Sequence, residues 1–254
     1  MTTADVAVHK PASRFAAIVR YTFQSCLPPR RWIGIIVACC GALLFGLLSQ
    51  TMSYSPVHRF ADMAAEGILS LVMPIAALII GDAVLGAEIR AGTFHFTWLS
   101  PTPGWQIATG RWIGGTVVAL VTIGPAVALA AVFGGVPEAI VPLAIAATCG
   151  AIAYVALFIA VACITRRTAV WSLAIVFLVE RLLGGVLTAI AQISPTWMAR
   201  ATFAGLLDDP PDRLVQDGVP HGGDAIVRLA IITIVCLVIA SWRIRHMKLS
   251  GATD

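Results

Sequence analysis

Charge is scarce in this sequence. Only 12% of its 254 residues are Asp, Glu, Lys or Arg, which is about half of the share in a typical globular protein. Apolar residues make up 59% of the chain, so too few polar side chains remain to cover a folded domain in water. The composition therefore excludes a water-soluble enzyme, a disordered chain and a collagen-like fibre. It indicates an all-α, polytopic membrane protein.

Motifs for catalysis and ligand binding are also missing. The chain has no GxxxxGK[S/T] sequence, and its lysines, Lys10 and Lys248, lie in the terminal segments, so no P-loop ATPase is encoded. The six cysteines contain no CxxC pair, which argues against a disulfide framework. No HExxH or Cys/His spacing indicates a metal site. We therefore expect no catalytic residue, cofactor or metal in this chain.

Six long apolar segments remain, each near or above the ~20 residues that a helix needs to cross the hydrocarbon of a bilayer. We expect helices because a backbone in lipid must satisfy its own hydrogen bonds. A transmembrane domain, 32–243, is thus predicted between a cytoplasmic segment, 1–31, and a cytoplasmic tail, 244–254. The predicted spans are residues 32–52, 68–87, 112–136, 139–164, 169–193 and 225–242, with a cytoplasmic segment 88–111 and an extracytoplasmic loop 194–224.

The basic residues predict the orientation. With both termini in the cytoplasm, twelve Lys and Arg residues fall inside and four outside, as the positive-inside rule requires. An excess of Arg over Lys and the abundance of Ala and Gly suggest a bacterial source, so we expect a multi-pass protein of the bacterial cytoplasmic membrane. The inside set is Lys10, Arg14, Arg20, Arg30, Arg31, Arg90, Arg111, Arg166, Arg167, Arg243, Arg245 and Lys248, and the outside set is Arg59, Arg200, Arg213 and Arg228.

The stretch from Pro11 to Leu27 has apolar residues at helical spacing and ends at two prolines. This pattern predicts an amphipathic helix lying in the cytoplasmic interface, and the alternative is a loosely ordered basic tail.

In the third span, Gly110 and Gly114 form a small-xxx-small pair, which permits a close helix approach.

The segment between the second and third spans has its own pattern. Gly92 permits a sharp turn, and Thr93 can cap a short helix that runs from Phe94 to Leu99. Prolines at 101 and 103 stop this helix. Its side chains are too apolar to be left in water, so the helix either docks into a groove of a cytoplasmic partner or rests on the lipid headgroups.

This segment resembles that of ABC-2 type transporter permeases. Those proteins have a Glu, a Gly-Thr pair, a short helix ending in Pro and a basic residue that begins the third span. The corresponding residues here are Glu88, Gly92, Thr93, Pro101 and Arg111. The resemblance implies that the short helix is a coupling helix that seats in a separate ATP-binding subunit. The residues that it assigns to ATPase coupling are Glu88, Gly92, Thr93, Phe94, His95, Phe96, Trp98 and Pro101.

The chain departs from that family at two positions. His95 replaces a residue that is often a carboxylate, and Gly104 replaces a residue that is often basic. The polar contacts to the ATP-binding subunit are therefore expected to differ from those of the family.

Two charged residues, Glu180 and Arg181, lie near the middle of the predicted span 169–193. A charge at this depth costs about 2.5–3.5 kcal/mol on insertion scales, so both side chains should face protein or water. Adjacent helical residues point about 100° apart, so we expect them to meet different neighbours. They either line the translocation path or dimer interface, or form a polar lock between helices.

Asp82 lies near the cytoplasmic end of the second predicted span. It could hold Arg90 or Arg111 and so stabilise the coupling segment. Alternatively, it is a plain carboxylate at the membrane interface.

These features predict the permease subunit of an ATP-driven ABC-2 type exporter, a class that includes multidrug efflux systems. Its cargo is expected to be hydrophobic or amphipathic and to leave the cell by alternating access. ATP and Mg²⁺ would be bound by the partner subunit. The predicted partners are a dimer of ATP-binding subunits, a second copy or related permease, and the lipid bilayer, but not nucleic acid. The alternative is an ATP-independent carrier or a membrane-embedded enzyme.

Overall fold

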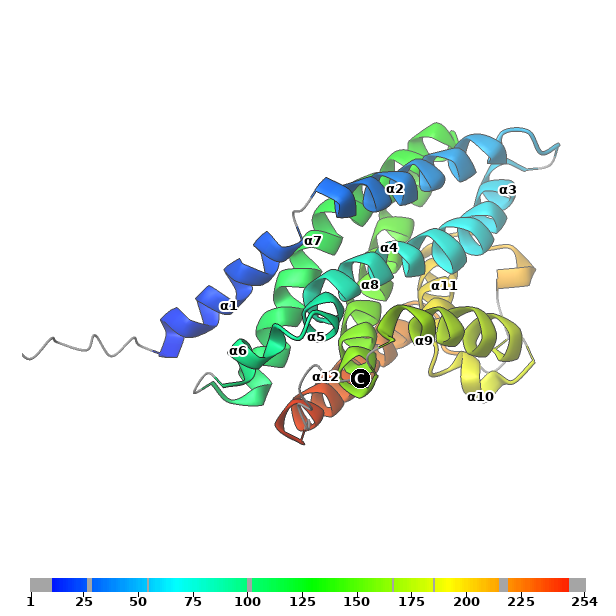
Figure 1. Cartoon of the computed structure of the whole chain (residues 1–254). Helices are drawn as coiled ribbons and strands as arrows, with labels where there is room; N and C mark the ends of the chain where they lie inside the picture. Colours follow the sequence, from blue (N-terminus) through cyan, green and yellow to red (C-terminus); the bar gives the residue numbers. More distant parts are fainter. Residues whose placement is uncertain are drawn as a thin grey trace, which may run out of the picture.

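The computed structural model describes residues 11–26, 29–53, 55–99, 102–165, 167–184, 186–214 and 219–246, which form helices joined by turns (Figure 1). In chain order the helices are α1 (Pro11–Ser25), α2 (Pro29–Ser49), α3 (Pro56–Met63), η1 (Ala64–Val72), α4 (Met73–Gly81), η2 (Asp82–Gly86), α5 (Ala87–Arg90), α6 (Phe94–Trp98), α7 (Gly104–Phe133), η3 (Pro137–Ala139), α8 (Ile140–Ile164), α9 (Thr168–Ala174), η4 (Ile175–Leu183), α10 (Thr188–Ala191), α11 (Pro195–Leu206), η5 (Asp212–Leu214) and α12 (Gly223–His246).

Five helices of the described residues are long and apolar enough to cross a membrane, where the sequence predicted six. Helix length and hydropathy therefore make the chain a multi-pass membrane protein. The five helical stretches are Trp32–Ser49, Pro56–Arg90, Gly104–Phe133, Pro137–Ile164 and Gly223–His246.

The predicted span 169–193 is the one that is not among these five helices. Its continuous helix, formed by α9 and η4, has 16 residues and ends at Leu183. At 1.5 Å per residue it is about 24 Å long, which is shorter than the ~30 Å of a hydrocarbon core. The rest of the predicted span turns through Gly184 and forms the short helix α10.

Contacts from the next segment explain this turn. The indole of Trp197, in α11, packs against Gly184, and a Cβ on that glycine would clash with it. The same indole donates a hydrogen bond to the carbonyl of Glu180 at 3.0 Å. The predicted outside loop 194–224 thus begins with a helix, α11, whose Met198 and Phe203 are fully buried. The chain therefore folds back into the bundle after Leu183.

The second long helix, Pro56–Arg90, extends beyond the predicted span 68–87 at both ends. Its α-helical turns alternate with two π-helical stretches, η1 and η2, and such stretches often occur at functional sites. At 1.5 Å per residue the helix is about 50 Å long, so its ends reach past the hydrocarbon. Glu66 lies in η1 and Asp82 in η2.

The helix Pro56–Arg90 and α8 form the centre of the bundle. In their most apolar stretches 78% and 72% of the residues are buried, compared with 28% in α2 and in α12. In α8, Tyr154 and Phe158 are fully buried and stacked, with ring centroids 5.2 Å apart. The helices α2 and α12 therefore present most of their apolar surface outward, where lipid can cover it.

The N-terminal helix α1 lies against the beginning of α7. Gly110 faces Ile18, and a Cβ on Gly114 would lie 2.7 Å from the Cβ of Thr22. The pair of small residues thus brings α1 against α7.

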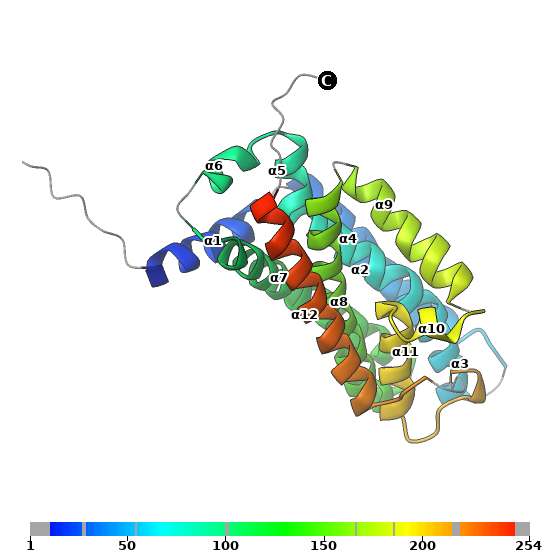
Figure 2. The same cartoon turned by 90° about the horizontal axis from the view of Figure 1, so that it is seen from below.

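The elements collect at two opposite ends of the bundle. Helices α1 and α6 and the C-terminal end of α12 lie at one end, and α3, α10 and α11 lie toward the other (Figure 2). At the second end, His58 of α3 is 3.7 Å from Asp209. The short α9–η4 helix runs with the long ones (Figure 2). The start of α1 and the end of α12 are thus at the same end of the molecule.

Candidate functional site

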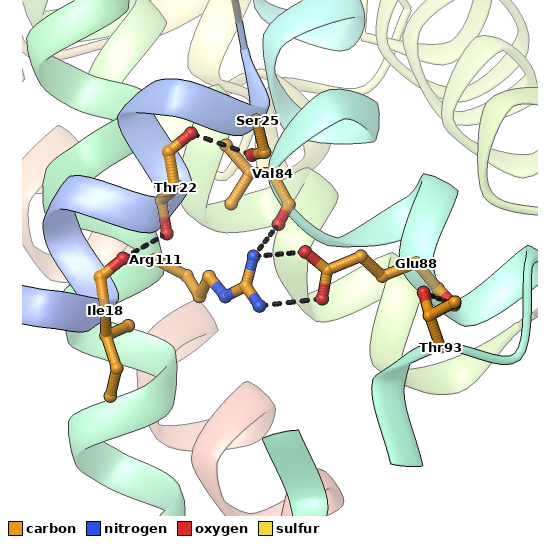
Figure 3. Close-up of polar contacts among 7 residues, drawn as sticks. All are labelled: Ile18, Thr22, Ser25, Val84, Glu88, Thr93 and Arg111. Carbon is orange, nitrogen blue, oxygen red and sulfur yellow. Dashed lines mark hydrogen bonds and ion pairs between the residues drawn. The ribbon is translucent and has the colours of Figure 1, made fainter. Parts of the chain in front are cut away.

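The second and third long helices are joined by a buried ion pair between Glu88 in α5 and Arg111 in α7. Both guanidinium–carboxylate contacts are 2.7 Å long, and the Arg111 side chain is only 2% exposed. Arg111 also donates to the carbonyl of Val84 at 2.9 Å (Figure 3). A two-point pair of this kind has a defined geometry as well as a strong attraction. It therefore holds the two helix ends in one orientation.

The N-terminal helix completes this junction. The ring of Tyr21 in α1 lies 5.0 Å from the guanidinium of Arg111, a distance at which a cation is attracted to an aromatic face. The negative charge of Glu88 raises the pKa of Tyr21, burial raises it further, and Arg111 opposes the shift. Figure 3 shows α1 passing beside the Glu88–Arg111 pair. Three segments that are distant in the sequence thus meet at one charged contact.

The turn after α5 fixes the start of α6. Gly92 has a φ of 70°, a value that L side chains adopt only with strain. The backbone N–H of Thr93 then donates to the carbonyl of Glu88 at 3.1 Å. The Thr93 hydroxyl lies 3.4 Å from the same carbonyl, and the Phe94 side chain is 1% exposed. The short helix is consequently anchored to the residue that forms the ion pair.

The far end of α6 contacts the last helix. The indole nitrogen of Trp98 donates to the carbonyl of Ile244 in α12 at 3.0 Å. Trp98 is 40% exposed and Leu99 is 71% exposed, so apolar surface is left at the outer end of α6. The predicted helix 94–99 is present as α6, while the side chains of His95 and Phe96 and all of Pro101 lie outside the described residues.

Asp82 pairs with Arg90, one of the two partners that the sequence allowed. Both carboxylate oxygens contact the guanidinium, but the Arg90 side chain is 42% exposed. This pair is much more open to solvent than the Glu88–Arg111 pair. The two acidic residues of this helix end therefore have separate basic partners.

A second polar cluster surrounds Glu180 in η4, which is 3% exposed. Its Oε2 accepts hydrogen bonds from the hydroxyl of Tyr154, from the hydroxyl of Ser194 at 2.6 Å and from the backbone N–H of Thr196 at 3.4 Å. These donors come from α8, from the residue before α11 and from α11 itself. The carboxyl group thus ties three parts of the chain together through uncharged donors.

Arg181 points to a different set of neighbours. Its guanidinium is 3.3 Å from the carboxylate of Glu66, which also pairs with Arg200 at 2.7 Å. The Arg200 guanidinium lies 4.6 Å from the Trp197 ring, and burial lowers the pKa of Arg200 although Glu66 opposes this shift. Glu66 and Arg181 remain about half exposed. The adjacent residues Glu180 and Arg181 therefore belong to two separate clusters.

Two hollows flank η4. One, of about 300 Å³, is lined by the charged residues Glu66, Arg181 and Arg200 together with Trp197. The other, of about 400 Å³, lies between η4 and α12 and is almost wholly apolar except for Glu180 and Ser194. Thr196 lines the first hollow and donates to the carboxylate that lines the second.

The sequence matches no protein-family model and no curated protein. What the helices themselves establish is a helical multi-pass membrane protein with five candidate spans.

Several residues of both clusters were not found from the sequence. The Glu88–Arg111 pair could have been inferred from two opposite charges at the facing ends of consecutive spans. In contrast, no local pattern connects Tyr154 or Ser194 with Glu180, or Trp98 with the end of α12. These contacts depend on how distant helices pack.

Proposed function

We propose that this chain is the permease subunit of an ATP-driven exporter of the ABC-2 type, and that α6 receives the movement of a separate ATP-binding subunit. The observation that carries the proposal is the attachment of α6 at both of its ends. Its start is bonded to Glu88, and its end is bonded to Ile244 through Trp98. The exposed Leu99 offers apolar surface for a partner.

The attachment supports a mechanical role because a stiff connection transmits a displacement that a flexible loop would absorb. A push on α6 would act on the second and third long helices together, since the Glu88–Arg111 pair joins them. Removing one partner from a buried pair costs about 3–5 kcal/mol, so we expect this pair to stay formed as the helices move. The push would also act on α12 through Trp98. Three long helices would then move together as the partner binds and hydrolyses ATP.

The sequence itself lacks the phosphate-binding loop of an ATPase. In the proposal, ATP and Mg²⁺ are therefore bound by a dimer of separate subunits on the cytoplasmic side. The basic ends of the helices favour the same side for α1, α6 and the end of α12.

A second permease copy, or a related permease, is part of the proposal. Glu66, in the first part of the helix Pro56–Arg90, and Arg181, two residues before the end of η4, are about half exposed in the single chain. Charged groups close to the hydrocarbon face protein or water because contact with lipid is costly. A facing permease and the hydrated path between the two would meet this requirement.

The proposal is tested by recovering the tagged chain from its native membrane and measuring ATPase activity in the recovered fraction. Leu99→Glu should abolish this activity by placing a charge in the docking surface. The matched control is Ser53→Glu, at an exposed position between α2 and α3, which should leave the activity unchanged. Stable ATPase binding by a chain that lacks residues 92–101 would refute the proposal, and transport in vesicles without any ATPase would favour an ATP-independent carrier.

A further inference from the structure

The apolar hollow between η4 and α12, which we call the Glu180 groove, has a volume of about 400 Å³. Apart from Glu180 and Ser194, all its lining residues are apolar. At its rim, Ile193, Ile231 and Val235 are 68%, 54% and 50% exposed. The groove is therefore open at the side of the bundle, where a bilayer would surround it.

Among the described residues that line this groove, none gives Glu180 a positive partner. Its Oε2 is bound by two hydroxyls and one backbone N–H, and none of the ion pairs within the described residues includes it. The adjacent Arg181 is paired with Glu66 on the other side of η4. A buried carboxylate without a counter-charge is costly, so a positive ligand would be the complementary one.

The hydrogen bonds also orient the carboxyl group. Its Oε2 accepts hydrogen bonds from the hydroxyls of Tyr154 and Ser194 and from the backbone N–H of Thr196. The Thr196 side chain is also hydrogen-bonded to the carboxyl group. Because the donors come from α8, Ser194 and α11, the group is held in place before a ligand binds, and such preorganisation lowers the entropic cost of binding.

We propose that the Glu180 groove binds a hydrophobic organic cation, with the charged group against Glu180 and the apolar part along η4 and α12. The apolar lining contributes affinity by removing apolar surface from water. The carboxylate contributes selectivity because it attracts a cation and repels an anion. The inference deepens the proposed function by giving the chemical class of the cargo. It rests on that function only in treating the bound cation as the cargo of an exporter.

The test uses the full chain in phosphatidylcholine nanodiscs and radiolabelled tetraphenylphosphonium, with empty nanodiscs as background. We expect saturable binding that is displaced by dodecyltrimethylammonium but not by dodecanol, which has the same chain without the charge. Glu180→Gln should weaken tetraphenylphosphonium binding at least roughly 30-fold, because it removes the charged partner of a buried pair. Glu138→Gln, at an exposed position in η3, should leave binding unchanged.

A second variant tests the groove without changing the hydrogen bonds of Glu180. Val235→Trp places a large ring at the half-exposed rim and should also reduce tetraphenylphosphonium binding. If Glu180→Gln does not fold, this variant decides the question. Unchanged binding in Val235→Trp, unchanged binding in a folded Glu180→Gln, or equal displacement by dodecanol would overturn the proposal and leave a groove for lipid chains.

This experiment is independent of any ATP-binding subunit. A chain that binds the cation through Glu180 but recruits no ATPase would contradict only the proposed function. A chain that recruits an ATPase but binds no cation through Glu180 would contradict only the binding site.

Discussion

Two glutamates of this bundle, Glu88 with an 11% exposed side chain and Glu180 with 3% exposure, are stabilised in different ways. Glu88 forms a two-point ion pair with Arg111, with both contacts at 2.7 Å. Glu180 accepts hydrogen bonds from uncharged groups such as the hydroxyls of Tyr154 and Ser194, and no described basic side chain forms an ion pair with it. Both side chains connect distant segments, but within the described residues only the first has its charge compensated.

The difference separates a structural contact from a site that can take a ligand. The attraction of a buried guanidinium offsets the cost of removing a carboxylate from water, so a paired carboxylate has little to gain from a further cation. A carboxyl group held only by neutral donors lacks a counter-charge, so a cation that binds beside it stabilises its charged form. In the proposals above, the Glu88–Arg111 pair accordingly transmits movement and Glu180 recognises a cation.

The largest expected effect comes from removing the cation of the first pair. Arg111→Met would leave Glu88, whose side chain is only 11% exposed, without its cation, which should lower the free energy of unfolding by about 3–5 kcal/mol. Urea unfolding of the purified protein in detergent measures this change. The matched control is Arg90→Met, because the Arg90 side chain is 42% exposed and its pair should contribute no more than about 1 kcal/mol. Equal losses in the two variants would remove the distinction between the pairs.

A pair of tyrosine variants compares the two glutamates directly. Tyr154→Phe removes a hydroxyl donor from Glu180 and should lower the free energy of unfolding by about 1.5–3 kcal/mol, since hydrogen bonds to charged groups contribute this much. Tyr21→Phe acts beside Glu88, where Arg111 already supplies the charge and Tyr21 is 52% exposed. We expect a loss below about 1 kcal/mol there. A larger loss in Tyr21→Phe than in Tyr154→Phe would show that Glu180 does not depend on its neutral donors.

The smallest expected effect on stability is at the outer end of α6. Trp98→Phe keeps an aromatic ring but loses the hydrogen bond to Ile244, which should cost only about 0.5–1.5 kcal/mol. Stimulation of the ATPase by cargo should nevertheless fall, because α6 would lose its contact with α12. Trp105→Phe, at a half-exposed position in the first turn of α7, serves as the control. Full stimulation in Trp98→Phe would mean that α12 takes no part in coupling.

Much of the fold follows from local sequence features. The long apolar segments predicted helices because a backbone in lipid has few alternatives, and five of them are present. Gly92 and the prolines at 101 and 103 predicted the short helix between the second and third spans. These are effects of neighbouring residues on each other, so a single sequence contains the necessary information.

The failures arise where a distant segment decides the outcome. Apolarity alone predicted a span over 169–193, but Trp197 and Ser194 bind Glu180 from beyond that span, and the chain turns after Leu183. For the same reason the sequence predicted that Glu180 and Arg181 contact different residues, but it could not identify those residues. Their identity depends on the packing of α8, α11 and η1 around η4.

The orientation of α6 tests the central claim most directly. Leu99→Cys and Ser53→Cys place a thiol at exposed positions of opposite ends of the bundle, and each can be labelled with a membrane-impermeant maleimide in intact cells and in inverted vesicles. The unaltered chain, with its six cysteines, gives the background. We predict that Cys at position 99 reacts only in inverted vesicles and Cys at position 53 only in intact cells. Labelling at position 99 in intact cells would contradict the account, because no cytoplasmic ATPase could then reach α6.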